Sequence, residues 1–283
     1  MSQHNTNLSL KDYNTFGLDV NAKNLVFLND LNQLEDIKDL KNCFFIGGVI
    51  IILLTGDIDK TVIVNQTKGI CTISEDEDQI ELAVASGENW HDFVLWCIDR
   101  DYGGLENMSL IPGSAGAAPM QNIGAYGKET KDVLTYVGAL DLDTLEKVRF
   151  TNEECEFGYR ESIFKKAAKG KYFITDIGVR LSKKEHQLNT SYGDIENWLA
   201  ERDITSPTIR DVSNAVISIR QSKLPDPAEL GNSGSFFKNP IIDQEHFDTL
   251  IEKFPGIKSY PAGEGKVKVP EALLPYMGGI TEL

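Results

Sequence analysis

The stretch of chain that most restricts the possible folds is residues 103–127, GGLENMSLIPGSAGAAPMQNIGAYG. It packs glycine, alanine and serine densely around a Pro-Gly turn, with Asn122 and Tyr126 among them. Small residues let a backbone approach a ligand closely, and successive N–H groups in tight turns form a concave anion site. Composition alone leaves a second interpretation, a glycine-rich surface loop. The segment is not a GxGxxG pattern after a strand, so a Rossmann nucleotide site is not supported.

The balance of charge excludes several classes of function. The 283 residues include 28 Lys and Arg against 43 Asp and Glu, a formal net charge of -15. Nucleic acids and anionic membranes bind basic surfaces, so neither is expected as a partner. A phosphate-bearing ligand must then be held by a local basic cluster or by backbone N–H groups.

The chain shows no sign of export or membrane insertion. Its first residues, MSQHNTNLSLKDYN, are polar and lack the apolar core of a secretion signal. The longest apolar run, residues 49–54, is far too short to span a bilayer. We expect a soluble cytoplasmic protein, and a monomer.

The cysteine and histidine spacings indicate no metal site. The cysteines are far apart and fit no CxxC pattern, so structural thiols in a reducing cytoplasm are expected. No pair of histidines has metal-ligand spacing with a nearby carboxylate or thiol, and no metal is expected. The residues concerned are Cys43, Cys71, Cys97, Cys155, His4, His91, His186 and His246.

Hydrophobic periodicity predicts an α+β chain. The expected strands are residues 44–46, 61–65, 80–85, 136–142, 147–150 and 172–181, with a hairpin around Asp143-Thr144. The expected helices are residues 31–41, 90–101, a helix that Ser206-Pro207 begins, and 244–254. Asn89 and Asp243 are the expected caps of the second and the last. These elements form three lobes: residues 1–66, a larger sheet-rich lobe of residues 67–205, and residues 206–283.

Six blocks of sequence occur in an order typical of one enzyme family. They are NTFG from Asn14, SGENWHDFV from Ser86, LENMSLIPGSAGAAPMQNIGAYG from Leu105, FGYRESIFK from Phe157, SYGD from Ser191 and SKLPDPAELGNSGSFFKNP from Ser222. With these blocks the chain resembles the UDP-N-acetylenolpyruvoylglucosamine reductase (MurB) family over residues 10–240. The SYGD block is similar to the subtype whose substrate domain has an extra tyrosine-bearing loop.

The resemblance implies a two-lobed FAD-binding fold of the MurB and vanillyl-alcohol-oxidase type, followed by an α+β substrate-binding domain. FAD would bind non-covalently, mainly in the second lobe, and NADPH would be the co-substrate. The implied reaction reduces UDP-N-acetylglucosamine enolpyruvate to UDP-N-acetylmuramate in peptidoglycan precursor synthesis, on which cell shape and division depend. The substrate would bind between the second and third lobes.

The resemblance also implies roles for single residues. Arg160 in GYRES matches the active-site arginine, which can stabilise negative charge that builds toward the substrate carboxylate. Ser235 in GSFFKNP matches the serine that donates the proton. Without the resemblance, Arg160 would be interpreted as a surface arginine and Ser235 as a turn serine. The implied FAD-binding residues are Gly47, Gly48, Ile111, Pro112, Gly113, Ala117, Gln121, Asn122, Gly124, Ala125 and Tyr126.

Three more residues match positions with which the family grips the UDP-sugar: Tyr192, Lys223 and Asn239. Lys223 precedes Leu-Pro-Asp-Pro, a rigid segment suited to aiming a cation at a diphosphate. With Lys238 it forms the local basic cluster that an anionic substrate requires on so acidic a protein. The alternative for Lys223 is a solvated surface lysine.

The sequence departs from the family at residues 46–55, IGGVIIILLT. The family has a Gly-Gly-Gly-Ser-Asn type of turn here, which wraps the FAD pyrophosphate, but this chain has Val49, Ile50 and Ile51 after two glycines. β-branched residues resist positive φ, and their side chains give no hydrogen-bond donor to a phosphate. We therefore predict weakened FAD binding.

The second departure is at the end of the chain. After Ala262 the sequence begins like the family's substrate domain and then stops, so we expect a truncated domain without the family's late glutamate. Glu271 and Glu282 lack the surrounding motif. The alternative to an active reductase is a non-catalytic or impaired flavin- or UDP-sugar-binding relative. Another flavin oxidoreductase is disfavoured, because SKLPDP and GSFFKNP resemble the MurB substrate side.

Overall fold

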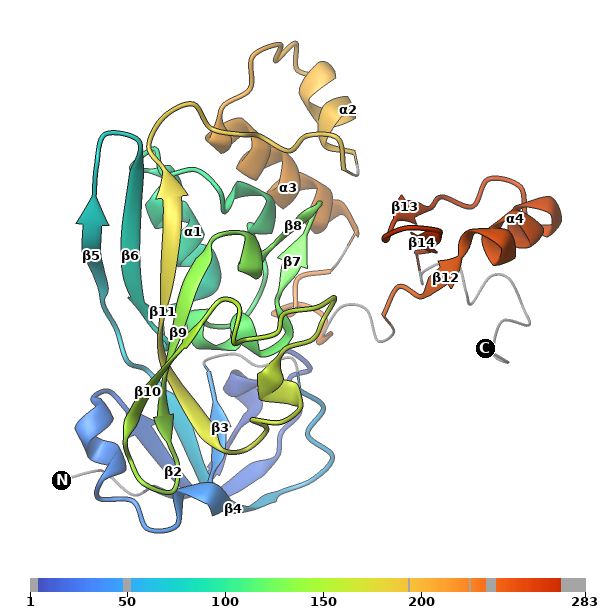
Figure 1. The fold of residues 1–283 in the computed structure, drawn as a ribbon. Coiled ribbons are helices and arrows are strands. Elements are labelled where there is room, and N and C mark those ends of the chain that lie inside the picture. Colours follow the sequence, from blue (N-terminus) through green and yellow to red (C-terminus); the bar gives the residue numbers. More distant parts are fainter. Residues whose placement is uncertain (1–4, 48–51, 193, 224, 233–237, 271–283) are drawn as a thin grey trace. The chain divides into compact units, whose positions relative to one another are not determined.

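Two β-sheets form the framework of the first of two units into which the chain divides, Met1–Asn232 and Ser233–Leu283. The computed structural model describes residues 5–47, 52–192, 194–223, 225–232 and 238–270. Figure 1 shows the elements of each unit.

The first sheet has the strand order β1-β2-β4-β3. The last four residues of β4, VIVN, are all buried, as expected of a strand covered on both faces. β2 and β3 run parallel to β4, whereas β1 is antiparallel to β2. The strands are β1 (Asn5–Ser9), β2 (Asn21–Leu28), β3 (Phe44–Ile46) and β4 (Ile58–Asn65). The strands predicted at residues 44–46 and 61–65 are therefore confirmed.

The helix predicted over residues 31–41 is wrong. Two short 3-10 helices, Leu31–Leu34 and Leu40–Asn42, occupy this stretch. Asp30 caps the first, and Asp39 adopts a left-handed φ of 54° ahead of the second. A left-handed residue cannot continue an α-helix, so the helical spacing of the leucines is realised by two separate turns.

The second sheet has five antiparallel strands in the order β10-β9-β11-β6-β5. β9 and β10 form the hairpin predicted around Asp143-Thr144. β11 has 11 residues and lies at the centre of the sheet. The strands are β5 (Ile70–Glu75), β6 (Gln79–Ala85), β9 (Leu134–Asp141), β10 (Lys147–Thr151) and β11 (Tyr172–Ser182).

Helix α1 (Trp90–Ile98) follows β6 directly. Asn89 caps it, because its side chain accepts a hydrogen bond from the backbone N–H of Asp92 at 3.0 Å. Such a cap stabilises a helix by about 1 kcal/mol. The predicted cap is confirmed, although the helix ends a few residues earlier than the prediction of 90–101.

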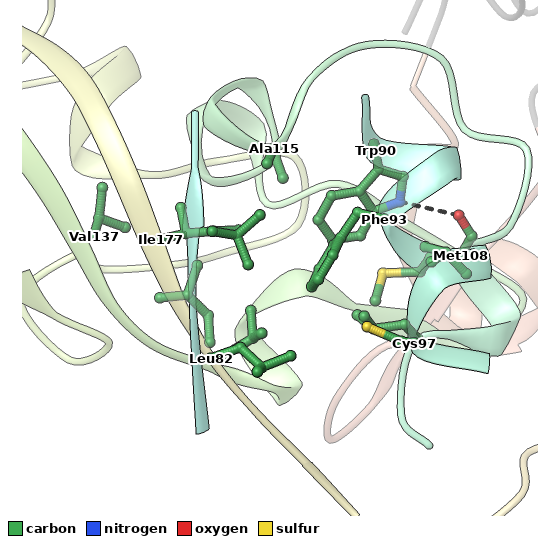
Figure 2. Packing of buried hydrophobic residues seen from close by; sticks show 14 of the residues in the cluster. Leu82, Trp90, Phe93, Cys97, Met108, Ala115, Val137 and Ile177 are labelled. Carbon is green, nitrogen blue, oxygen red and sulfur yellow. Dashed lines mark hydrogen bonds between the residues drawn. The ribbon is translucent and has the colours of Figure 1, made fainter. Parts of the chain in front are cut away.

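The apolar face of α1 packs against the second sheet. Figure 2 shows Trp90 and Phe93 on the side of the helix that faces Leu82 of β6 and Ile177 of β11. Trp90 is completely buried, and its indole N–H donates to the carbonyl oxygen of Met108 at 3.1 Å. Burial of each large side chain contributes about 1.5–3 kcal/mol. The start of α1 and the segment around Met108 are thereby fixed to each other.

A separate apolar cluster joins the two sheets of the first unit. Leu28 of β2 packs with Leu140 of β9 and Phe173 of β11. The ring of Phe45 in β3 lies 5.0 Å from that of Phe173. The end of β3 is therefore anchored on the second sheet.

Helices α2 (Ile195–Ala200) and α3 (Ile209–Lys223) share an apolar cluster with Tyr126 at its edge. α3 is the helix predicted after Ser206-Pro207. Its start is held by Thr208 rather than the serine, because the Thr208 and Asp211 side chains each accept a hydrogen bond from the other's backbone N–H.

The second unit contains a three-stranded sheet in the order β12-β14-β13 and helix α4. Phe247 of α4 is buried with Val267 and Val269. Asp243 occupies the N-cap position of α4, but its side chain makes no capping hydrogen bond. The elements are β12 (Ile241–Asp243), α4 (Gln244–Lys253), β13 (Tyr260–Pro261) and β14 (Lys266–Lys268).

Candidate active site

The glycine-rich segment, residues 103–127, is fastened to the residues between β6 and α1. The backbone N–H of Gly116 donates to the carbonyl oxygen of Ser86 at 2.9 Å. The backbone N–H of Trp90 donates to the carbonyl oxygen of Gly113 at 3.0 Å. These bonds fix the backbone on which a ligand would rest.

Two glycines allow chain segments to approach closely here. A Cβ on Gly116 would lie 2.5 Å from the Cβ of Ser86 and 3.1 Å from its Cα. A Cβ on Gly47, just after β3, would overlap the hydroxyl of Ser114. Gly113 has a φ of 115° and open space where a side chain would be, so a ligand can lie against its backbone. The end of the first sheet and the glycine-rich segment thus meet at one place.

Asn122 and Arg160 hold the far end of the segment. The buried Asn122 amide donates to the Glu129 carboxylate at 2.9 Å and to a backbone carbonyl at 3.1 Å, and its oxygen accepts a backbone N–H at 3.0 Å. Arg160 donates from Nη2 to the carbonyl oxygen of Gly124 at 2.7 Å and from Nη1 to that of Asn122 at 3.4 Å. Its guanidinium is therefore fixed beside the short strand β7 (Gly124–Ala125), which pairs with β8 (Lys128–Glu129).

Four of the ten non-glycine residues with a left-handed conformation in the described chain lie in these segments. Their φ angles are 58° at Leu110, 45° at Asn122, 48° at Tyr126 and 56° at Arg160. Each such residue is held against an unfavourable backbone energy of about 1–3 kcal/mol, and strain of this kind is concentrated at functional sites.

Two tyrosines meet beside the end of the glycine-rich segment. The rings of Tyr126 and Tyr192 are edge to face, with centroids 6.5 Å apart and planes at 86°. The fully buried Asn107 donates to the carbonyl oxygens of Tyr126 at 3.0 Å and Asn189 at 2.8 Å. Asn107 therefore ties the loop that carries Tyr192 to the glycine-rich segment.

Positive charge gathers near Tyr126. Lys223 ends α3, and its Nζ lies 2.8 Å from a carboxylate oxygen of Asp194. Arg220 is one helical turn earlier on α3. Burial raises the pKa of the Tyr126 hydroxyl, and the charges of Arg220 and Lys223 partly oppose that rise.

Known proteins are similar in sequence to this chain over most of its length. A UDP-N-acetylenolpyruvoylglucosamine reductase of Flavobacterium johnsoniae is 53% identical over 272 residues, which is 95% of this chain and 81% of the relative. The chain belongs to the MurB family. A reductase of the same name from Chromobacterium violaceum is 44% identical over 273 residues, 94% of this chain and 80% of that protein. Residues 43–144 match a family described as an FAD binding domain.

The MurB fold is seen in a solved structure as well. The UDP-N-acetylenolpyruvylglucosamine reductase of Thermus caldophilus matches with a TM-score of 0.57 at 20% identity, over 95% of this chain and 88% of that one. The predicted α+β, two-lobed FAD-binding fold is confirmed. The lobe boundaries 1–66, 67–205 and 206–283 stay predictions.

The FAD-binding residues that the MurB motifs predict lie in one continuous stretch of the chain and in one neighbouring turn. Gly47 is the neighbour, beside Ser114. Gly48 and the substituted residues 49–51 lie outside the described residues, so weakened FAD binding stays a prediction. The continuous stretch contains Ile111, Pro112, Gly113, Ala117, Gln121, Asn122, Gly124, Ala125 and Tyr126.

The other predicted site residues are divided between the two units. Arg160, Tyr192 and Lys223 belong to the same unit as the glycine-rich segment. Asn239 belongs to the second unit, and Ser235 lies outside the described residues. The structure therefore brings together one side of the predicted site.

Sequence reasoning missed three residues of this side. Ser114 faces Gly47, Asn107 holds both tyrosine-bearing segments, and Arg220 adds a charge near Tyr126. A usable signal existed only for Arg220, because a cation three residues before Lys223 on a helix lies on nearly the same face. Asn107 and Ser114 are recognisable only through contacts with distant segments.

A hollow of about 380 Å³ lies elsewhere in the first unit and contains none of the predicted site residues. Lys131 and Arg180 are among its lining residues. Both are paired with carboxylates, at 3.1 Å to Glu129 and 2.8 Å to Glu81. The hollow is therefore not the expected anion site.

Metal ligands and reactive thiols do not gather anywhere in the described ranges. No cluster of three or more His, Cys, Asp or Glu residues there could hold a metal ion. Burial raises the pKa of the Cys97 thiol, and it raises that of Cys155 to about 12. No described helix has the length and apolar character needed to cross a membrane.

Proposed function

We propose that the protein reduces UDP-N-acetylglucosamine enolpyruvate to UDP-N-acetylmuramate in peptidoglycan precursor synthesis, with FAD as cofactor and NADPH as co-substrate. The observation that carries this proposal is the 53% identity over 272 residues to a reductase of that name. The match of residues 43–144 to an FAD binding domain supports the cofactor.

The residues around Gly113 fit a flavin nucleotide. Gly113 leaves open space above a backbone at φ 115°, and Gly47 lets the end of β3 reach Ser114. The backbone N–H groups of the 3-10 turn Ala115–Ala117 donate to the carbonyl oxygens of Glu88, Ser86 and Ser114, which fixes the turn beside the open backbone of Gly113. When bound, FAD carries hydride from the nicotinamide to the substrate. The nine predicted residues between Ile111 and Tyr126, with Gly47, would hold it.

Arg160 would bind the substrate carboxylate. Two of its nitrogens donate to the carbonyl oxygens of Asn122 and Gly124, and this holds the guanidinium in place. A guanidinium has five N–H donors, so others can reach a carboxylate. A charge fixed in advance stabilises the negative charge that grows toward the carboxylate during reduction. Ser235 would donate the proton to the neighbouring carbon.

Tyr192 and Lys223 would hold the UDP-sugar. Tyr192 packs on Tyr126 at the end of the glycine-rich segment, and Lys223, at the end of α3, supplies a positive charge that acts on Tyr126. Asn239, a residue of the second unit, would be a further residue that binds the UDP-sugar. Glu271 and Glu282, the carboxylates weighed as replacements for the family's late glutamate, lie outside the described residues.

The partners would be small molecules only. A net charge of -15 disfavours nucleic acids and anionic membranes. We expect a cytoplasmic monomer that binds NADPH and a UDP-sugar in turn.

The visible absorption of the purified protein tests this function. Oxidised flavin should give a visible band that NADPH bleaches without oxygen, and the enolpyruvyl sugar should then restore it. A band that NADPH bleaches but the sugar does not restore would contradict the proposed substrate. Absence of any flavin band would favour the alternative, an impaired relative of the reductases.

A further inference from the structure

One arginine at the substrate side of the site has no partner for its charge among the residues that the structure describes. Arg220 lies on α3, and its Nε is buried without a hydrogen-bond partner. Within the described ranges its guanidinium makes no hydrogen bond or ion pair. Even partial burial of a charged group without a counter-charge is unfavourable, so the half-buried Arg220 requires an explanation.

The groups around Arg220 do not supply a negative charge. Tyr126 and His91 both lie within its electrostatic reach. Burial raises the pKa of the Tyr126 hydroxyl, which therefore stays protonated at neutral pH. The His91 ring accepts a hydrogen bond from the backbone N–H of Leu110 at 3.0 Å, so it is neutral.

The nearby cation is already neutralised by a carboxylate. Lys223, one turn further along α3, lies 2.8 Å from Asp194. Residues three apart on a helix share nearly the same face, so Arg220 and Lys223 are presented to the same region. An anion that enters beside Tyr126 would find one balanced charge at Lys223 and one unbalanced charge at Arg220.

We propose that Arg220 binds the diphosphate of a nucleotide substrate, beside Lys223. A guanidinium can hold two phosphate oxygens at once, whereas an ammonium acts as a point charge. On a protein of net charge -15, a diphosphate needs more than the one cation that Asp194 already balances. The inference rests on the proposed function, because UDP-sugar and NADPH each carry the diphosphate.

The same arrangement makes a prediction about stability that distinguishes a ligand-binding arginine from a structural one. In the free protein, Arg220 is a half-buried charge that folding partly desolvates. Arg220→Met keeps an unbranched side chain and removes that charge. The variant should unfold at a temperature about 2–4 °C above that of the wild type, whereas loss of a structural arginine would lower it.

The binding test compares Arg220→Met with Arg210→Met, measured by calorimetry on the holoenzyme. Arg210 lies on the same helix but is exposed, and it pairs with Asp99 at 2.7 Å. Arg220→Met should weaken binding of UDP by about 10- to 100-fold and leave uridine unchanged. Arg220→Lys should keep part of the affinity, and Arg210→Met should change neither ligand.

A second measurement identifies which substrate, NADPH or the UDP-sugar, places its diphosphate at Arg220. The NADPH concentration that half-saturates flavin reduction should rise in Arg220→Met if the NADPH diphosphate binds there, and stay constant if only the UDP-sugar does. Unchanged affinity for both UDP and NADPH, or an equal loss for uridine, would overturn the assignment. Failure of the proposed function looks different, because wild-type flavin would then be bleached by NADPH and not reoxidised by the enolpyruvyl sugar.

Discussion

Two sides of the site differ in how completely their polar groups are paired. The flavin side is formed by residues 111–125 with Arg160, and the tyrosine side by Tyr126, Tyr192 and the groups around them. On the flavin side, the Asn122 amide makes three hydrogen bonds and the Arg160 guanidinium two. On the tyrosine side, three polar atoms are buried without a hydrogen-bond partner in the described part of the chain: Asn107 Oδ1, Trp198 Nε1 and Arg220 Nε. Asn107 donates from Nδ2 to the carbonyl oxygen of Tyr126, and Trp198 shares an apolar cluster with Tyr126.

This difference shows on which side folding alone gives the polar groups their hydrogen-bond partners. A fully paired network holds its geometry before any ligand arrives, and electrostatic catalysis needs such preorganisation. Buried groups without partners are rare in proteins, and a ligand is one explanation of them. The flavin side is therefore preformed, whereas the tyrosine side keeps buried polar atoms without a hydrogen-bond partner among the described residues.

The largest effect is expected at Arg160, the fixed charge of the preformed side. Arg160→Gln should slow reduction of the enolpyruvyl sugar by about 100- to 1000-fold, because a preorganised charge on the growing anion is removed. Stopped-flow spectra of the two half-reactions measure this. NADPH should still bleach the flavin at nearly the wild-type rate, and an equal loss in both halves would contradict the role of Arg160.

The next effect is on the stability of the same side. Asn122→Ala removes three hydrogen bonds and places alanine at a φ of 45°, so we expect a loss of about 2–4 kcal/mol in the free energy of unfolding. Urea denaturation measures the loss. Asn197→Ala, at an exposed position of α2, should change stability by less than about 0.5 kcal/mol. Similar effects of the two substitutions would show that the Asn122 network is not essential.

A smaller effect should follow from crowding the glycine-rich segment. Gly116→Ala places a Cβ 2.5 Å from that of Ser86, and overpacking of this kind destabilises a protein by about 1–3 kcal/mol. Gly56→Ala is the matched control, because a Cβ there meets nothing within 4 Å. The amount of flavin that co-purifies should fall for Gly116→Ala alone. Equal flavin content in both variants would contradict the close approach at Gly116.

The smallest effect concerns pH and the tyrosine side. Burial lowers the pKa of the His91 imidazole, partly opposed by Asp92 and assisted by Arg220. The folded state then binds the proton less readily than the unfolded chain. The stability that comes from the neutral His91 ring is therefore present above about pH 6.5 and is lost as the pH falls below it. His91→Asn keeps a hydrogen-bond acceptor near Nδ1 but cannot titrate.

The melting temperature of wild type and His91→Asn between about pH 7.5 and 5 measures this contribution. The wild type should lose more stability than the variant on acidification. Parallel curves would mean that the proton on His91 is not coupled to folding.

Local patterns were enough to predict much of the framework. Asn89 caps α1, and the hairpin around Asp143-Thr144 forms, because each depends on neighbours in sequence. Residues 31–41 have the spacing of a helix but fold as two turns, since Asp39 takes a left-handed conformation that no periodicity reveals. The motif containing Arg160 predicted a site residue, and its hydrogen bonds to Asn122 and Gly124 fit that assignment.

The tyrosine side could not be predicted in the same way. Arg220 is notable because it lacks a partner, and that depends on what α3 packs against. Asn107 joins segments 82 residues apart in the chain. Such contacts come from tertiary packing, which composition and spacing do not determine.

The most direct test of the account is the product itself. The protein should be incubated without oxygen with NADPH and UDP-N-acetylglucosamine enolpyruvate, and the sugar analysed by mass spectrometry. The account predicts that each NADPH oxidised yields one UDP-N-acetylmuramate, the substrate with a pair of hydrogen atoms added. Oxidation of NADPH with the enolpyruvyl sugar recovered unchanged would contradict it.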